Sequence, residues 1–217
     1  MPSGSDRYPV PTGRARAEDV IRRSRFIATL APAATVEEAK AFIDEVRAEH
    51  PGATHNCFAF VAGPPGSTMR VGMSDDGEPH GTAGRPMLDV LLHSGVGDVA
   101  VVVTRYFGGT KLGTGGLVRA YSGAVKRVLS EAAVREKVSW RLVGLVVEYP
   151  ALEGVRRLCA ELEAVIDTES FAEDVRLEVC VPAEDVERFR SALADRFGAL
   201  ARCVADTDAH RPGDGVH

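Results

Sequence analysis

The chain contains 217 residues, of which 45% are hydrophobic and 26% are charged, and its formal net charge is −5. This composition is typical of a globular protein and excludes a disordered chain, and the length allows one large hydrophobic core or two smaller ones. The negative net charge argues against a protein that binds nucleic acid over its whole surface, but it is compatible with a local basic patch.

The first half of the chain combines strand and helix patterns. Residues 1–16 are rich in Pro, Gly and Ser and are expected to form a flexible N-terminus. Beyond them, alternating or continuous apolar residues predict strands, and apolar residues at helical spacing predict helices. The predicted elements are strand Ser24–Leu30, helix Thr35–Glu49, strands Cys57–Val61 and Met69–Met73, helix Gly84–His93, strand Val99–Thr104 and helix Gly115–Ala132.

The second half begins after a charged stretch, Arg135-Glu136-Lys137, and its elements follow a different order. They are strand Leu142–Tyr149, helix Leu152–Leu162, strands Val165–Phe171 and Asp174–Val181, helix Glu184–Phe197 and strand Leu200–Val204. Strand-helix-strand-strand-helix-strand is the order of a ferredoxin-like domain. We therefore expect an α+β chain with an N-terminal domain at 17–137, a C-terminal domain at 138–208 and a flexible tail at 209–217.

The charge distribution is the strongest indication of a binding surface. The segment from Val99 to Ser130 has no Asp or Glu, yet it carries five cations: Arg105, Lys111, Arg119, Lys126 and Arg127. An acidic protein that keeps one segment free of carboxylates is expected to offer that segment to an anion. Tyr106 and Phe107 lie inside it and could stack on bases. The alternative is that the aromatic residues fill the core and the cations form a solvated helix face.

A glycine-rich loop, Gly108–Gly116, follows the buried strand and leads into the long helix. Glycines allow backbone amides to approach an anion, and the positive end of the helix dipole and Lys111 add favourable charge. The spacing fits neither a P-loop nor a dinucleotide-binding fingerprint, because Thr114 and Val118 stand where those motifs require Lys and Gly. The alternative is a tight connection that needs positive φ angles.

A carboxylate loop, Ser74–Gly84, gathers Asp75, Asp76, Glu78 and His80. Such a group could hold a divalent cation or supply acid and base groups, although it lacks the alternating spacing of a calcium loop. The alternative is a polar turn followed by a helix that Thr82 caps. We favour a turn that shapes one wall of a binding cleft.

The cysteines give little indication of catalysis. Thr54-His55-Asn56-Cys57 contains the residue types of a cysteine hydrolase, and alternation places His55 and Cys57 on one face of a strand, but reactivity also requires contact between them. The four cysteines form no CxxC pair, which predicts free thiols and no zinc site. No apolar run reaches the roughly 20 residues of a membrane helix, and a cytoplasmic protein is expected.

Several segments taken together resemble the YigZ/IMPACT family. They are Ser24–Ala28, Ala53–Cys57, Ser74–Pro79, Gly81–Pro86, Val103–Gly109, Lys111–Gly113 and Gly115–Leu117. Their ordered combination covers nearly all of residues 18–135 and is highly specific, although His80 departs from the small residue expected between Glu-Pro and Gly-Thr.

The resemblance implies an N-terminal domain like the second domain of ribosomal protein S5 and a C-terminal ferredoxin-like domain similar to those of elongation factor G. It also implies suspected nucleic-acid binding in the bacterial members. Eukaryotic relatives regulate translation with an additional N-terminal domain for which this chain has no room, so that role is not expected here.

We expect a non-enzymatic protein that binds RNA or associates with the ribosome, with translation regulation as one outcome. The expected nucleic-acid or anion-binding residues are Arg105, Tyr106, Phe107, Gly108, Gly109, Lys111, Gly113, Gly115, Arg119 and Lys126, and the expected cleft wall consists of Asp75, Asp76, Glu78 and Thr82. No catalytic residue, metal or cofactor is expected, and a monomer is favoured. The alternatives are a small-molecule enzyme that binds phosphate at Gly108–Gly116 and a protein-docking module.

Overall fold

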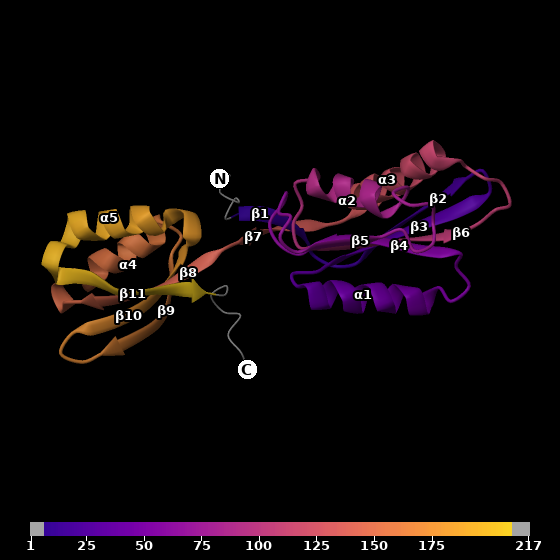
Figure 1. Cartoon of the computed structure of the whole chain (residues 1–217). Coiled ribbons are helices and arrows are strands. Elements are labelled where there is room, and N and C mark those ends of the chain that lie inside the picture. The colour runs from indigo at the N-terminus through magenta and orange to yellow at the C-terminus, as the bar shows by residue number, and fades with distance from the viewer. Residues whose placement is uncertain (1–6, 210–217) are drawn as a thin grey trace. The chain divides into compact units, whose positions relative to one another are not determined.

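The computed structural model describes residues 7–209 of the chain, so residues 1–6 and 210–217, which fall in the segments expected to be flexible, lie outside the described residues. The chain divides into two compact units between Lys137 and Val138 (Figure 1). The predicted fold class, α+β with an N-terminal domain of the ribosomal S5 type and a C-terminal ferredoxin-like domain, is confirmed.

The N-terminal unit is built on a five-stranded antiparallel sheet with the strand order β2-β3-β6-β4-β5. The strands are β2 Ala15–Ile21, β3 Ser24–Pro32, β4 His55–Val61, β5 Val71–Ser74 and β6 Val99–Tyr106. The central strand β6 is buried from Val99 to Arg105, as its run of β-branched residues predicts. It extends beyond the predicted end at Thr104, and this extension decides where Arg105 and Tyr106 lie.

Three helices cover the two faces of this sheet (Figure 1). They are α1 Val36–Glu49, which Thr35 caps through its hydroxyl, α2 Gly84–Leu92 and α3 Thr114–Glu131. Helix α1 packs on one face, against Ala100 and Val102 of β6. Helices α2 and α3 pack on the other face, against Val101 and Val103. Because side chains alternate along a strand, Arg105 belongs to the α2–α3 face and Tyr106 to the α1 face.

The expectation of a flexible segment up to residue 16 is wrong for residues 7–16. Strand β1 Arg7–Pro11 pairs with β7 Val134–Val138, and β2 begins at Ala15. Tyr8 is only 5% exposed and donates a hydrogen bond to Asp98, which also pairs with Lys137. The prolines that suggested a loop occupy a two-stranded ribbon, where a missing N–H is tolerated.

The C-terminal unit has the ferredoxin-like strand order β11-β8-β10-β9, with antiparallel neighbours. Its elements are β8 Trp140–Val147, α4 Leu152–Glu161, β9 Val165–Phe171, β10 Val175–Pro182, α5 Val186–Phe197 and β11 Ala201–Ala209. Helices α4 and α5 pack on the sheet around Phe189 and Leu158, both fully buried (Figure 1). Within residues 7–209, no helix is long and apolar enough to cross a membrane.

The two units have separate cores, because the buried clusters of the first contain residues 17–128 and the cluster of the second contains residues 143–201.

The separate cores predict that a core substitution in one unit leaves the other unit unaffected. We expect Phe189→Ala to destabilise the C-terminal unit by about 3–5 kcal/mol. We expect Leu91→Ala to destabilise the N-terminal unit by about 2–5 kcal/mol. Hydrogen exchange in urea, followed peptide by peptide, measures both. Equal loss of protection in both units from either substitution would contradict separate unfolding.

Candidate functional site

The loop between β6 and α3 folds back against the hairpin that joins β2 to β3. A Cβ atom at Gly108 would lie 2.0 Å from the backbone of Arg23, so only glycine permits this approach. The N–H of Gly108 donates to the hydroxyl of Ser24 at 3.1 Å. Gly109 and Gly113 adopt φ values of 84° and 74°, which glycine favours, so part of the glycine pattern serves the tight connection considered above.

Arg105 is buried in the interior, which corrects its assignment as a phosphate contact. It is 4% exposed, and its Nη1 lies 2.5 Å from Oε1 of Glu78. Its guanidinium lies 5.3 Å from the ring centroid of Phe26 and 5.4 Å from that of Phe107. The cause is the extra length of β6, which places residue 105 under the glycine-rich loop, where its charge requires a buried partner.

Glu78 is the buried partner that joins three segments of the N-terminal unit. Its Oε1 accepts hydrogen bonds from Arg105 and, at 2.7 Å, from the hydroxyl of Tyr121 on α3. Burial raises the pKa of the Tyr121 phenol, so this group stays protonated and remains a donor. Oε2 of Glu78 lies 3.9 Å from Nε2 of His55 on β4. The carboxylate therefore ties the loop to β6 and α3.

The two neighbouring aspartates hold the carboxylate loop in place. Asp75 accepts backbone N–H bonds from Gly81, Ala83 and Gly84 at 2.8–3.0 Å and so caps the start of α2. The expected cap, Thr82, instead donates its hydroxyl to the carbonyl of Pro79.

Asp76 accepts the backbone N–H of Asn56 on β4 at 2.6 Å and pairs with Arg47 of α1. These bonds give the loop carboxylates structural partners, and the described residues contain no cluster of His, Cys, Asp and Glu that could hold a metal ion.

A pocket of about 430 Å³ opens between the carboxylate loop, the end of β6 and the start of α3. Its walls come from Thr54, His55, Glu78, Pro79, Arg105, Phe107, Lys111, Leu112, Gly113, Thr114 and Leu117. Of the four residues expected to form a cleft wall, only Glu78 lines it. Asp75, Asp76 and Thr82 support the loop instead. We call this hollow the Glu78 pocket.

Cys57 and His55 do not form a nucleophile and base. Cys57 is fully buried, its thiol donates to the carbonyl of Asp75 at 2.9 Å, and burial raises the pKa of this thiol to about 12. A thiol with such a pKa is protonated at neutral pH and a poor nucleophile. His55 bonds through Nδ1 to the carbonyl of Asp76 at 2.8 Å, which requires the proton on Nδ1 and leaves Nε2 as an acceptor in the neutral ring.

Four exposed cations surround the glycine-rich loop and define what we call the basic end surface: Arg22, Arg23, Lys111 and Arg119. Arg22 and Arg119 line a shallow hollow of about 190 Å³. None of the four forms an ion pair with a carboxylate of the described residues. Sequence reasoning missed Arg22 and Arg23, which lie about 80 residues before the acid-free segment. The sequence feature that could have indicated a binding role for them is two adjacent arginines at a hairpin turn.

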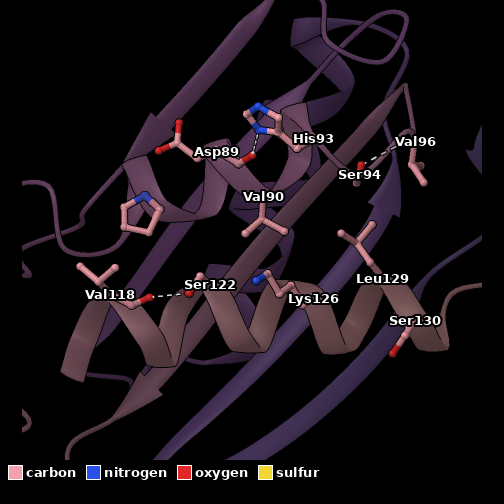
Figure 2. Close-up of a pocket in the computed structure, with 11 residues that line it drawn as sticks. Asp89, Val90, His93, Ser94, Val96, Val118, Ser122, Lys126, Leu129 and Ser130 are labelled. Atoms are coloured by element: carbon pink, nitrogen blue, oxygen red, sulfur yellow. Dashed lines mark hydrogen bonds between the residues drawn. The ribbon is translucent and has the colours of Figure 1, made fainter. Parts of the chain in front are cut away.

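The remaining cations of the acid-free segment lie apart from this surface. Lys126 extends from α3 beside Val90 of α2, in a groove of about 680 Å³ (Figure 2). Arg127 is neutralised by Asp19 of β2 and by Glu131, four residues further along α3. The acid-free segment therefore does not form one continuous basic face.

The two aromatic residues that could stack on bases point to opposite faces of the sheet. Tyr106 lies on the α1 side, where its hydroxyl bonds to His50 at 3.0 Å and its ring packs under Arg25. Phe107 lies on the α3 side and is 47% exposed. Its backbone N–H donates to the hydroxyl of Thr54 at 3.0 Å, which anchors the residue. Of the two aromatic residues, Phe107 is the more exposed.

Two family models match the chain. A model described as the Impact N-terminal domain matches residues 22–129, a range that contains the Glu78 pocket and the basic end surface. A model described as a domain of unknown function, DUF1949, matches residues 145–199.

Similar proteins match over nearly the whole chain. The IMPACT family member YigZ of Escherichia coli (strain K12) is 45% identical over 186 residues, which cover 86% of this chain and 91% of that protein. An IMPACT family member of Haemophilus influenzae is 40% identical over 189 residues, covering 87% and 92%. A crystal structure of a hypothetical protein matches with a TM-score of 0.64 at 42% identity, covering 92% of this chain and 97% of that chain.

The buried pair yields a prediction on stability. Glu78→Gln leaves the Arg105 charge without a counterion, and we expect a loss of about 3–5 kcal/mol in the free energy of unfolding. Adding Arg105→Met should restore part of this loss, because no buried charge then remains. The control is Asp89→Asn at the exposed Arg85–Asp89 pair, where the expected loss is below about 1 kcal/mol. Urea denaturation measures all four proteins, and equal losses at the two sites would contradict the prediction.

Asp75 yields a prediction on pH. Partial burial raises the pKa of Asp75, but the N–H groups of Gly81, Gly84 and Ala83 outweigh this effect and lower it below its ordinary value. A lowered pKa in the folded state contributes stability at neutral pH that is lost as the pH falls below about 4. Asp75→Asn should therefore cost about 1–3 kcal/mol at pH 7 and progressively less in acid. Urea denaturation across this pH range tests it, and a cost independent of pH would contradict it.

Proposed function

We propose that this chain, which belongs to the IMPACT family, binds single-stranded RNA, free or within the ribosome, and contacts the phosphate backbone through the basic end surface. The observation that carries this proposal is the set of four exposed cations, without carboxylate partners among the described residues, on a protein whose net charge is −5. Cations held apart from local carboxylates are available to an external anion.

The hairpin conformation supports the proposal. Arg22 and Arg23 are the two central residues of the β2–β3 turn and adopt φ values of 48° and 68°. Hairpin turns of this kind prefer Asn and Gly, and a non-glycine residue in the left-handed region costs on the order of 1–3 kcal/mol. Strained residues concentrate at functional sites, so two arginines at such positions favour a binding role for their charges over a purely structural one.

The start of α3 supplies a second source of positive potential. The helix begins at Thr114 with no side-chain cap and no acidic residue in its first turn. Its first N–H groups have no partner within the helix, and its dipole places partial positive charge beside Lys111. Backbone amides and cations together form the usual contacts to phosphate oxygens. Phe107, exposed at the same end, supplies a surface on which a base can stack.

The alternative of a small-molecule enzyme loses support at the carboxylate loop. That alternative required Asp75, Asp76 or Glu78 to hold a metal, but each of these carboxylates accepts hydrogen bonds from the fold itself. Cys57, with its buried and protonated thiol, offers no nucleophile. We therefore propose a binding function rather than a catalytic one.

The proposal predicts how salt affects RNA affinity. Each phosphate contact releases counterions, so Arg119→Gln should reduce the slope of log affinity against log salt by about 0.7 for a single strand. Combining Lys111→Glu with Arg119→Glu should weaken binding to all RNA sequences alike, because phosphate contacts carry no base information. Fluorescence anisotropy with labelled oligonucleotides at several salt concentrations measures both effects.

The matched control is Arg127→Gln on the same helix, because Asp19 and Glu131 already neutralise that charge. This variant should keep the slope of the parent protein. Absence of RNA binding by the parent at low salt, or an equal change of slope in Arg119→Gln and Arg127→Gln, would remove the basic end surface as an RNA site.

A further inference from the structure

We propose that the Glu78 pocket binds a single nucleoside monophosphate group whose base carries an amino group beside a ring nitrogen acceptor, as in adenine and cytosine. This chemistry is shared by a free mononucleotide and by the terminal nucleotide of an RNA strand. The inference shares Lys111, Phe107 and the start of α3 with the proposed function, and it adds a ligand of its own for the pocket of about 430 Å³ that these residues line. Small-ligand pockets commonly measure about 300–1,000 Å³.

The phosphate end of the pocket lies at the start of α3. Gly113 and Thr114, where the helix begins, line the pocket together with Lys111. The helix has no side-chain cap and no acidic residue in its first turn, so its N–H groups and dipole are uncompensated. A Cβ at Gly115, the residue after Thr114 in the first turn, would meet nothing within 4 Å, so this position can accept a side chain. These features fit a phosphate group.

An unpaired buried donor provides an independent indication of a ligand. Arg105 lines the pocket and is 4% exposed, yet its Nε has no hydrogen-bond partner among the described residues. Its other guanidinium nitrogens are bonded to Glu78 and Ser24. Leaving a buried donor unpaired is unfavourable, and such groups are uncommon in folded proteins. A ring nitrogen of a bound base would provide the missing acceptor.

Two further polar atoms belong to residues that line the same pocket, Glu78 and His55. Oε1 of Glu78 accepts from Arg105 and Tyr121, whereas Oε2 has no hydrogen bond among the described residues and lies 3.9 Å from Nε2 of His55. In the neutral ring the proton is on Nδ1, which donates to the carbonyl of Asp76, and Nε2 is then an acceptor as well. Acceptors and a donor in one pocket match a ligand edge that presents an amino group beside a ring nitrogen, which adenine presents and hypoxanthine does not.

The pocket also offers a surface for the flat faces of the base. Phe107 lines the pocket, is 47% exposed and is anchored through its backbone to Thr54. Leu112, Leu117 and Pro79 supply apolar surface elsewhere in the lining. A base can stack on Phe107 while the phosphate lies at the start of α3, so the two parts of the ligand occupy different parts of the pocket. The pocket thus has a place for each part of the group.

Isothermal titration of the full chain with AMP, IMP and adenosine tests the proposal. AMP should bind saturably, and both IMP and adenosine should bind at least about tenfold more weakly. IMP carries a carbonyl and a ring N–H where AMP carries an amino group and a ring acceptor, and adenosine lacks the phosphate. Phe107→Ala should weaken AMP binding by about tenfold through lost stacking. Absence of saturable AMP binding up to about 1 mM, or equal affinity for AMP and IMP, would overturn the proposal.

A pair of glycine substitutions on α3 separates binding from folding. Gly115→Asp places a negative charge in the first turn, where it favours the helix but repels a phosphate, so the variant should fold and bind AMP at least about tenfold more weakly. Gly123→Asp makes the same charge change two turns further along, also where a Cβ meets nothing within 4 Å, and should bind AMP like the parent. Equal affinities of the two variants would overturn the phosphate placement.

Competition with RNA identifies the source of the group. If an oligonucleotide with a terminal phosphate displaces AMP and its dephosphorylated form does not, the pocket binds strand ends. If neither oligonucleotide displaces AMP, the pocket binds the free nucleotide. Both results require the pocket. RNA binding with normal salt dependence but without AMP binding would overturn this inference alone, whereas AMP binding without RNA binding would overturn the proposed function alone.

Discussion

The buried ion pair between Arg105 and Glu78 is the interaction on which the N-terminal unit depends. Glu78 comes from the carboxylate loop, Arg105 from the end of the central strand, and Tyr121 from the long helix α3. Taking both charges out of water is costly, and the pair is stable only because Tyr121 and Ser24 satisfy further hydrogen-bonding positions. Through Tyr121 the same carboxylate joins the carboxylate loop to α3, and both Glu78 and Arg105 line the pocket.

This constraint separates the charges of the N-terminal unit into two groups. The carboxylates of the loop and Arg105 hold the fold together, since each is bonded to backbone or to a partner within the unit. Arg22, Arg23, Lys111 and Arg119 have no such role and remain exposed around the loop. The interior charges are therefore already paired, whereas the exposed cations around the loop are not. An anionic ligand can bind these cations without breaking an internal contact.

The acid-free segment was a useful but incomplete guide to this site. Lys111 and Arg119 are both exposed. For Arg119 the reason is that a helix that packs with one apolar stripe leaves its charged positions in solvent. The acid-free segment did not indicate that Arg105 is buried or that Lys126 lies in a groove apart from the basic end surface. Absence of carboxylates within a segment also says nothing about carboxylates that reach it from elsewhere, as they do at Arg105 and Arg127. Glu78 lies 27 residues from Arg105 in the chain, and Asp19 lies 108 residues from Arg127.

The sequence by itself determined the α+β class, the order of most strands and helices, and the position of the glycine-rich loop. These follow from local periodicity and from residues that tolerate unusual backbone angles. The ribosomal S5 type of the N-terminal domain came from the family resemblance. The tertiary structure alone decided that residues 7–16 form strands, that Arg105 points inward, and that Arg22 and Arg23 join Lys111 and Arg119 on one surface. These outcomes depend on strand pairing and on the burial of charge, which bring together residues far apart in the chain, and no local pattern of residues encodes such pairings.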